Sequence, residues 1–285
     1  LAAGKGTRLY PMTKPVCKPL VPVYDKPLVY YPLSTLMQAG IKDILIIIPP
    51  GEEESFYNLL GDGSHIGIHI EYAVQYVARG IADALLIGKE FIGNDDVCLI
   101  LGDNIFHRDK MEKLMKKARE DMSEGGALVF GYRVRDPRPF GVVEFDDSGR
   151  VLSIEEKPKL PKSNYIIPGL YFYDNQVIDI AENLKPSARG ELEITDVNIE
   201  YMNRGCLNVI PLRRGMTWLD AGNADSVLAA ALLVKSFQNS GYNIGCIEEV
   251  AWKMGFISLE QVHQLGKAME TTNYGQYLLE LEPDI

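Results

Sequence analysis

The first 27 residues, LAAGKGTRLYPMTKPVCKPLVPVYDKP, combine glycine, basic residues and proline in a pattern that suits a phosphate-binding loop. Glycines such as Gly4 and Gly6 let the backbone turn with positive φ and let its N–H groups approach an anion without a Cβ in the way. Arg8 and Lys18 can then hold the charge of that anion, while the prolines prevent the segment from becoming a helix. The residue types leave one alternative open, an ordinary strand-to-helix connection with surface cations.

Two well-known phosphate loops can be tested against this stretch, and both fail. The run from Gly4 to Leu9 begins like G-x-G-x-x-G, but Leu9 stands where the third glycine belongs. The stretch also contains no G-x-x-x-x-G-K-[ST] run. The sequence therefore supports neither an NAD-binding loop nor a P-loop.

Two aspartates from distant parts of the chain follow short apolar runs. Asp103 comes directly after the apolar run 97–101 and Gly102, and Asp220 lies in Trp-Leu-Asp-Ala-Gly at residues 218–222. Two carboxylates can share one Mg²⁺, which prefers oxygen ligands and keeps waters and substrate phosphates. The alternative is that each aspartate only caps a turn.

These residues must be positioned by strands that alternate with helices. The apolar, β-branched runs 44–48 and 97–101 are typical of strands that are covered on both faces. The helices expected in this half of the chain cover residues 27–39, 52–60, 80–88 and 110–122, and further strands cover 66–74 and 127–133. This alternation predicts an α/β fold with a doubly wound, mostly parallel, Rossmann-like sheet, whose ligands bind at the carboxyl ends of the strands.

The second half of the chain has a different pattern of expected elements. Residues 140–145 and 151–154, with a turn at 146–149, predict an inserted β-hairpin. The other elements expected here are strands at 166–173 and 207–212 and helices at 175–184 and 224–237. We expect an α/β domain over residues 1–240 and a C-terminal helical appendage over 241–285. Because such a fold needs an apolar strand leading into the glycine loop, we also expect this chain to lack most of its first strand.

Composition excludes several classes of protein. The chain has 285 residues and a formal net charge of −10, which disfavours binding to nucleic acid or to an anionic membrane surface. No apolar run approaches the ~20 residues of a membrane-spanning helix, and no signal peptide is recognisable. The four cysteines have no C-x-x-C spacing, which favours reduced thiols. We therefore expect a cytoplasmic protein.

Several motifs across the chain resemble one enzyme family. They are G-x-G-T-R-L-x-P-x-T at 4–13, Y-D-K-P at 24–27, Y-Y-P-L-S-T-L-M at 30–37, G-D-N at 102–104, E-E-K-P at 155–158, S-A-R-G-E-L-E-I-T-D at 187–196 and W-L-D-x-G at 218–222. Together they resemble the sugar-1-phosphate nucleotidylyltransferases, and among these the branch that uses dTTP and glucose 1-phosphate. The resemblance implies the reaction dTTP + α-D-glucose 1-phosphate → dTDP-glucose + pyrophosphate, with Mg²⁺ as cofactor.

The same resemblance implies roles for individual residues. Catalytic residues would be Arg8, Lys18 and Lys157. Nucleotide-binding residues would be Leu1, Ala3, Gly4, Gly6, Thr7, Arg8, Gln75, Gly80 and Asp103, with Gln75 and Gly80 reading the pyrimidine base. Residues that bind the sugar phosphate would be Asn104, Gly141, Glu156, Lys157, Gly169 and Arg189. The metal ligands would be Asp103 and Asp220.

The resemblance also implies partners and leaves alternatives. It implies the first step of dTDP-L-rhamnose synthesis, feedback inhibition by dTDP-rhamnose, and a homotetramer with the C-terminal extension near the regulatory site. Another pyrimidine nucleotide, UTP or CTP, is the nearest alternative. A catalytically silent, sugar-nucleotide-binding regulatory subunit on the same fold is the alternative from another class, and the presence of all the assigned charged residues argues against it.

Overall fold

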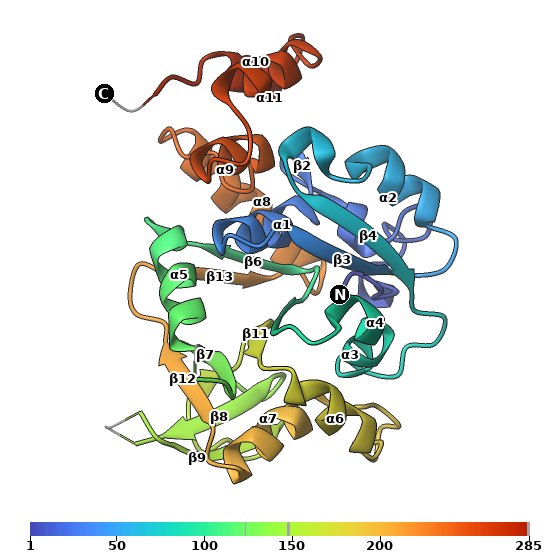
Figure 1. Cartoon of the computed structure of the whole chain (residues 1–285), viewed down its shortest axis with the longest axis vertical. Coiled ribbons are helices and arrows are strands. Elements are labelled where there is room, and N and C mark those ends of the chain that lie inside the picture. Colours follow the sequence, from blue (N-terminus) through green and yellow to red (C-terminus); the bar gives the residue numbers. More distant parts are fainter. Residues whose placement is uncertain (123, 147–148, 284–285) are drawn as a thin grey trace.

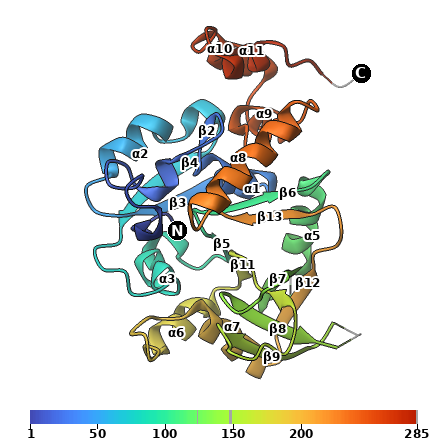
Figure 2. The same ribbon diagram turned by 180° about the vertical axis from the view of Figure 1, so that it is seen from behind.

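A computed structural model describes residues 1–122, 124–146 and 149–283 of the chain, and shows an α/β body with a helical appendage at its C-terminal end (Figures 1 and 2). The helices are α1 (Tyr30–Gln38), α2 (Glu53–Leu60), α3 (Asp83–Ile87), α4 (Lys89–Ile92), α5 (Met111–Asp121), α6 (Gln176–Asn183), α7 (Ile194–Asn203), α8 (Ala224–Gln238), α9 (Ile247–Lys253), α10 (Leu259–Lys267) and α11 (Asn273–Leu279). The strands are β1 (Pro22–Val23), β2 (Lys26–Pro27), β3 (Asp43–Ile48), β4 (His69–Val74), β5 (Val97–Ile100), β6 (Asn104–His107), β7 (Ala127–Arg133), β8 (Gly141–Phe145), β9 (Val151–Glu156), β10 (Tyr165–Ile166), β11 (Leu170–Tyr173), β12 (Leu207–Pro211) and β13 (Thr217–Asp220). Short 3₁₀ turns cover Thr7–Leu9, Lys18–Leu20 and Ser64–Ile66.

The apolar runs of the sequence become the buried strands. β3 pairs in parallel with β4, from Asp43 opposite His69 to Ile48 opposite Val74. The larger sheet has the order β5-β11-β7-β10-β8-β9, with β12 parallel to β7. In β7 the side chains of residues 127–130 are all fully buried, which fits a strand that is covered on both faces.

The α/β class is confirmed, and the sheet is mixed where the sequence predicted a mostly parallel one. β11 lies between β5 and β7 and runs antiparallel to both, and β8 is antiparallel to β9 and β10. The chain therefore returns across the sheet in the region after β7 without the helical crossovers that a parallel sheet needs. The inserted hairpin is present as β8 and β9, while turn residues 147 and 148 lie outside the described residues.

Two predicted features differ in detail. The strand expected over 166–173 is divided into β10 and β11, because Pro168 between them has no N–H to donate to a neighbouring strand. The sequence analysis missed β6 and β13, which form their own antiparallel pair with Asp220 opposite Asn104. This short pair proves important because it joins the two predicted metal ligands.

The first residues of the chain lie between β3 and β5. Leu1 N donates to Ile100 O (2.7 Å) and Leu1 O accepts from Gly102 N (2.8 Å), which is the hydrogen-bond pattern of a parallel strand. On the other side, Ala2 N donates to Ile47 O (2.7 Å). These residues thus link the β3–β4 pair to the larger sheet.

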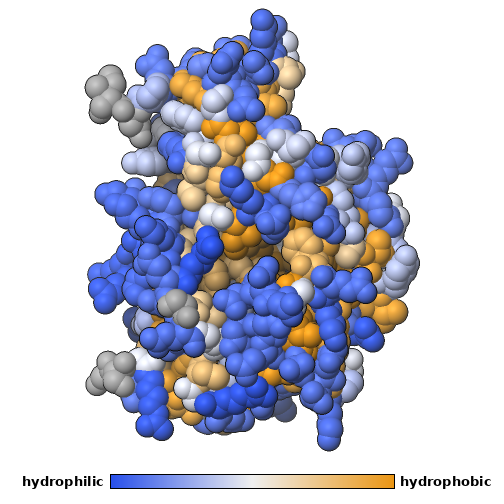
Figure 3. Space-filling model, viewed as in Figure 1, coloured by the Kyte–Doolittle hydropathy of each residue, from blue (hydrophilic) through white to orange (hydrophobic). Residues whose placement is uncertain are grey.

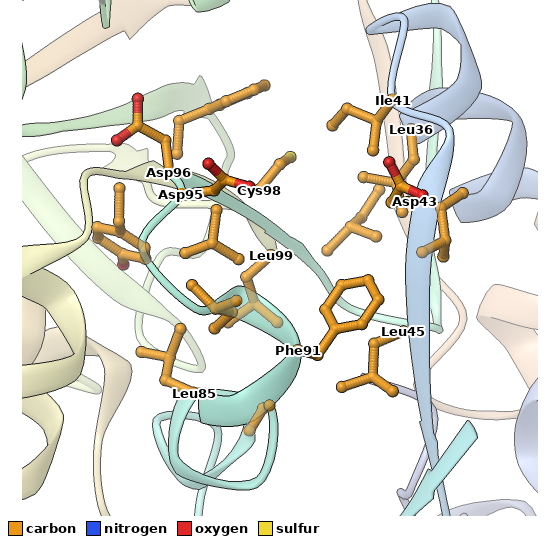
Figure 4. Close-up of a pocket in the computed structure, with 18 of the residues that line it drawn as sticks. Leu36, Ile41, Asp43, Leu45, Leu85, Phe91, Asp95, Asp96, Cys98 and Leu99 are labelled. Carbon is orange, nitrogen blue, oxygen red and sulfur yellow. The ribbon is translucent and has the colours of Figure 1, made fainter. Parts of the chain in front are cut away.

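A slot opens next to these residues, between the facing edges of β3 and β5. It has a volume of about 1030 Å³ and is lined mainly by apolar side chains, among them Leu45, Leu85, Phe91 and Leu99 (Figure 4). Figure 3 shows that this face of the molecule is hollowed near its centre, where hydrophobic residues gather between hydrophilic margins. Within the described ranges, no strand ladder joins β3 directly to β5.

The appendage helices α9, α10 and α11 pack on the body. Apolar side chains of α9 and α11, such as Ile247 and Leu278, belong to the same buried cluster as Ile48 of β3. Lys26 is only 2% exposed and donates to Asn243 Oδ1 (3.0 Å) and to its neighbour Asp25 (2.7 Å), so a buried cation also ties the two parts together. The division near residue 240 stays a prediction, since the two parts share one core.

The interior of the appendage also holds a carboxylate. Glu248 of α9 is buried and accepts a hydrogen bond from the Tyr274 hydroxyl. Burial raises the pKa of the Glu248 carboxyl above its ordinary value. Among the described helices, none is long and apolar enough to cross a membrane.

Candidate active site

The β6–β13 pair brings the two predicted metal ligands together. Asp103 immediately precedes β6 and Asp220 ends β13, and Ala221 N donates to Asp103 O (2.9 Å). Burial raises the pKa of the Asp220 carboxyl, and the negative charge of Asp103 raises it further, whereas Lys18 and Arg8 act in the opposite direction. Two neighbouring carboxylates that repel each other are a natural place for a cation.

Lys18 provides a cation at this pair. Its Nζ lies 2.5 Å from Asp103 Oδ2, although 85 residues separate the two in the chain, and the lysine side chain is only 8% exposed. The glycine loop folds onto Lys18, since a Cβ on Gly6 would lie 3.0 Å from the Lys18 Cβ. Gly6 has φ +60°, and its carbonyl accepts from Thr13 Oγ1 (2.6 Å). Arg8 is exposed on the same loop, where its guanidinium can meet a ligand.

Asn104 holds this region in place. Its Nδ2 donates to Asp103 Oδ1 (2.8 Å), and its Oδ1 accepts from Trp218 Nε1 (2.6 Å) and from Gly169 N (3.1 Å). Asn104 and Gly169 were predicted to bind the sugar phosphate, and they lie within one hydrogen bond of each other. A Cβ on Gly169 would lie 2.6 Å from Leu101, so glycine is required there by packing. The side chain of Asn104 therefore fixes the direction of the Asp103 carboxylate.

A second group of predicted residues gathers at the end of the hairpin. Glu156 lies opposite Gly141 in the β8–β9 ladder. Its carboxylate accepts from Thr195 Oγ1 (2.5 Å) and lies 3.3 Å from both Lys157 Nζ and the Arg189 guanidinium. Lys157 and Arg189 are each partly exposed, so both cations can also meet an anionic ligand.

Glu193 and Thr195 are site residues that the sequence analysis did not assign. Glu193 is 8% exposed and binds the Arg189 guanidinium through both carboxylate oxygens (2.8 Å each) and the Ser187 hydroxyl (2.7 Å). Glu193, itself held by Ser187, therefore fixes the position of the Arg189 guanidinium. Their signal was present in the sequence, because the matching motif at 187–196 contains all four residues.

The predicted base-reading residues lie beyond the carboxyl end of β4. Gln75 is 7% exposed, and its backbone N donates to Ile48 O (2.9 Å). Gly80 has φ +109°, and a Cβ there would lie 2.4 Å from Leu192 O. Leu192 also exchanges backbone hydrogen bonds with Arg79 (2.6 Å) and Ala82 (3.1 Å). The loop around Gly80 is therefore fastened to the segment that carries Arg189.

Replacing Gly80 with Ala should damage both ends of the site, because the new Cβ collides with the Leu192 backbone and φ +109° is strained for alanine. We expect a loss of about 1–3 kcal/mol of unfolding free energy and higher KM values for both substrates. Chemical denaturation and steady-state kinetics check this. Gly205→Ala is the control: Gly205 has φ +74° but nothing within 4 Å of its Cβ, so it should lose stability without a change in either KM.

The structure therefore resolves the predicted residues into connected groups. Ala3 belongs to the same buried cluster as Ala82, which follows Gly80 by two residues in the chain, and Leu1 O accepts from Gly102 N, directly before Asp103. Burial raises the pKa of the Tyr171 phenol, and the negative charges of Glu156 and Asp103 raise it further. Gly4 and Thr7 lie on the loop itself, and a Cβ on Gly4 would meet nothing within 4 Å.

The donor set suits a divalent cation of the magnesium type. Within the described residues, no group of three or more His, Cys, Asp and Glu side chains is arranged to hold a metal. The pair Asp103 and Asp220 offers only carboxylate oxygens. Mg²⁺ is commonly bound by one or two carboxylates and completes its shell with water and substrate phosphates. The arrangement fits a metal that arrives with, or is completed by, a phosphate substrate.

A glycine loop, a carboxylate pair and two sets of cations suit an enzyme that binds phosphate groups together with a divalent metal. The profile of the nucleotidyl transferase family matches residues 1–236, and the chain belongs to this family. Enzymes that transfer nucleotidyl groups generally use a divalent metal, in agreement with the carboxylate pair.

Individual relatives and solved structures are also similar to this chain. A glucose-1-phosphate thymidylyltransferase of Neisseria gonorrhoeae is 54% identical over 282 residues, which cover 99% of this chain and 97% of the relative. A crystal structure described as a glucose-1-phosphate thymidylyltransferase from Bacillus anthracis, in complex with sucrose, is 41% identical with a TM-score of 0.75 and covers 81% of this chain and 92% of its own. A UDP-glucose pyrophosphorylase with bound UDP-glucose is 22% identical with a TM-score of 0.71, covers 84% of this chain and 97% of its own, and shares the fold.

Proposed function

We propose that this chain transfers a thymidylyl group from dTTP to α-D-glucose 1-phosphate and so forms dTDP-glucose and pyrophosphate. The observation that carries the proposal is the presence of two cation groups in one site. Lys18 and Arg8 surround the carboxylate pair, and Lys157 and Arg189 surround Glu156. A reaction between two polyanions needs both groups, whereas a binding subunit needs no paired carboxylates. The choice of substrates is supported by the thymidylyltransferase relatives, one of which is 54% identical to this chain over 282 residues.

The mechanism follows from the charges. An oxygen of the sugar phosphate attacks the α-phosphorus of dTTP in line, and the bond from that phosphorus to the β-phosphate oxygen breaks. Pyrophosphate leaves with the electron pair of the broken bond. The nucleophile is already anionic at neutral pH, so the step needs no general base. Catalysis is then positioning and charge stabilisation.

The cations have separate tasks in this scheme. Lys157 and Arg189 hold the incoming phosphate, and Glu156 holds sugar hydroxyls beside them. Lys18 contacts the phosphates of the nucleotide, and Arg8 stabilises the departing pyrophosphate. Gln75 and Gly80 contact the base.

We infer that the divalent metal is Mg²⁺ and that Asp103 and Asp220 hold it. When bound, Mg²⁺ supplies positive charge to the phosphate oxygens as the transition state develops. Asp103 Oδ2 contacts Lys18 and Asp103 Oδ1 accepts from Asn104, so the metal would use the remaining lone pairs of these oxygens together with the Asp220 carboxylate.

We further propose that the enzyme is a cytoplasmic homotetramer that supplies dTDP-L-rhamnose synthesis and is inhibited by dTDP-rhamnose. Leu228 and Leu232 lie one turn apart on α8 and are each 60% exposed, which supports a contact between subunits. Sedimentation velocity tests the tetramer. Adding dTDP-rhamnose to the assay tests the inhibition.

Pyrophosphate release with glucose 1-phosphate and Mg²⁺, compared among dTTP, UTP, CTP and ATP, tests the proposed function. We expect the fastest turnover with dTTP. If a folded protein turned over no nucleotide, the enzyme would be excluded and a silent sugar-nucleotide binder favoured. A preference for another nucleotide would keep the mechanism and contradict the role of Gln75 and Gly80 as readers of thymine.

A further inference from the structure

A buried carboxylate lies directly behind the predicted base-reading glutamine. Asp83 begins α3 and is only 1% exposed. Its Oδ2 accepts from Gln75 Nε2 (2.9 Å), and its Oδ1 accepts from an Arg79 guanidinium nitrogen (2.7 Å). Neither Asp83 nor Arg79 belongs to the sequence motifs that indicate the reaction.

This contact fixes which way the Gln75 amide points. An ionised carboxylate can only accept hydrogen bonds, so the group of Gln75 that faces Asp83 must be its NH₂. The guanidinium of Arg79 donates a charge-assisted hydrogen bond to the other carboxylate oxygen and so holds the carboxylate in place. A flipped amide would place its oxygen against the carboxylate, where two acceptors face each other without a proton. Asp83 and Arg79 therefore allow one orientation.

The oxygen of the Gln75 amide is left open on the other side. None of the described residues has a buried side-chain nitrogen or oxygen without a hydrogen-bond partner. Gln75 donates through Nε2, and within the described part of the chain no donor reaches its Oε1. That oxygen is therefore not completely buried, although Gln75 as a whole is only 7% exposed, and a ligand that reaches it can donate to it. The backbone bond from Gln75 N to Ile48 O keeps the residue at the carboxyl edge of β3 and β4, next to the phosphate loop.

We propose that Asp83 is a positioning residue that makes Gln75 present a hydrogen-bond acceptor to the nucleobase, and so selects bases with an N3–H donor. Thymine and uracil carry that donor, whereas cytosine has an unprotonated N3 that would face the amide oxygen. Cytosine would then leave two acceptors opposed and unpaired, which disfavours it. This inference rests on the proposed function, in which Gln75 contacts the base. It adds the reason why the site would discriminate against cytidine nucleotides.

The variant Asp83→Asn tests the inference. An asparagine of the same shape can donate or accept, so the Gln75 amide can take either orientation. We expect the ratio of kcat/KM for dTTP to that for dCTP to fall about 10- to 100-fold, the effect of one misdirected buried hydrogen bond. The ratio of dTTP to dUTP should stay constant, because both bases carry N3–H. If Asp83 had only a structural role, the variant would lower kcat/KM for dTTP, dCTP and dUTP by the same factor. An unchanged dTTP-to-dCTP ratio would therefore overturn the inference.

Two additions keep the test decisive. If Asp83→Asn does not fold, Arg79→Gln is the second variant: it removes the contact that holds the Asp83 carboxylate, at a side chain that is 58% exposed, and should lower the same ratio. Lys89→Gln, which breaks an ion pair with Glu182 away from Gln75 at a lysine that is similarly exposed (54%), is the control and should leave the ratio unchanged. Equilibrium binding of dTDP and dCDP needs no turnover. Loss of the binding ratio in the variants supports the role of Asp83 even if the wild-type chain releases no pyrophosphate, which would contradict only the proposed function.

Discussion

Replacing Asp103 with Asn should lower kcat about 1000-fold while the protein stays folded. The substitution removes one of two charges that would hold the metal and removes the partner of the buried Lys18 ammonium. Loss of one fixed charge at a developing phosphate charge is expected to cost about 10²–10³ in rate, and the displaced lysine adds to this. Pyrophosphate release at saturating substrates and Mg²⁺ measures the effect. Circular dichroism and the thermal midpoint report folding.

A second readout separates the metal from the lysine. Mn²⁺ titrated into the protein in the presence of dTTP should bind more weakly to Asp103→Asn than to the wild type, and more metal should restore part of the activity. Asp109→Asn removes an exposed carboxylate a few residues along the chain and is the control for overall charge. If Asp103→Asn kept a tenth or more of the wild-type kcat, Asp103 could not be a ligand of a catalytic metal.

The sequence identified the site residues better than it identified what holds them. Asp103 and Asp220 could be selected because each follows an apolar run and lies close to a glycine, Gly102 before Asp103 and Gly222 after Asp220. Their proximity depends on β6 and β13, which the sequence analysis missed. Each of these strands has only four residues, too few to show a period of hydrophobicity.

The sequence analysis also could not identify the residues that position other site residues. Asp83, Glu193 and Thr195 position Gln75, Arg189 and Glu156, and their importance lies in contacts across the chain that spacing alone does not reveal. The mixed direction of the sheet has a similar cause. An apolar run such as 170–173 predicts a buried strand, but only its neighbours decide whether it runs parallel or antiparallel to them.

The slot between β3 and β5 is the basis of a second prediction, which concerns the thermal stability of the protein. Leu1 already pairs in parallel with the residues that follow β5, and Ala2 pairs with β3. A strand continued backwards from Leu1 would run into the slot between two free strand edges. Its side chains would meet apolar residues on both faces, as a central parallel strand requires. The far end of the slot is acidic, with Asp43 on one side and Asp95 and Asp96 on the other (Figure 4).

Extending the chain before Leu1 by one lysine and five apolar β-branched residues should therefore raise the thermal midpoint. Each buried apolar side chain contributes about 1.5–3 kcal/mol, and ordering its residue costs most of that, so we expect a net gain of about 3 kcal/mol. For a protein of this size the gain corresponds to a rise of about 6–12 °C in the thermal midpoint, measured by scanning calorimetry.

The same extension with two central prolines cannot pair with both strands and should give no increase in the midpoint. Glutamate in place of the lysine should give a smaller rise, because burial and neighbouring carboxylates already raise the pKa of Asp96 at that end of the slot. Equal midpoints for the apolar and proline extensions would show that the added residues do not enter the slot as a strand.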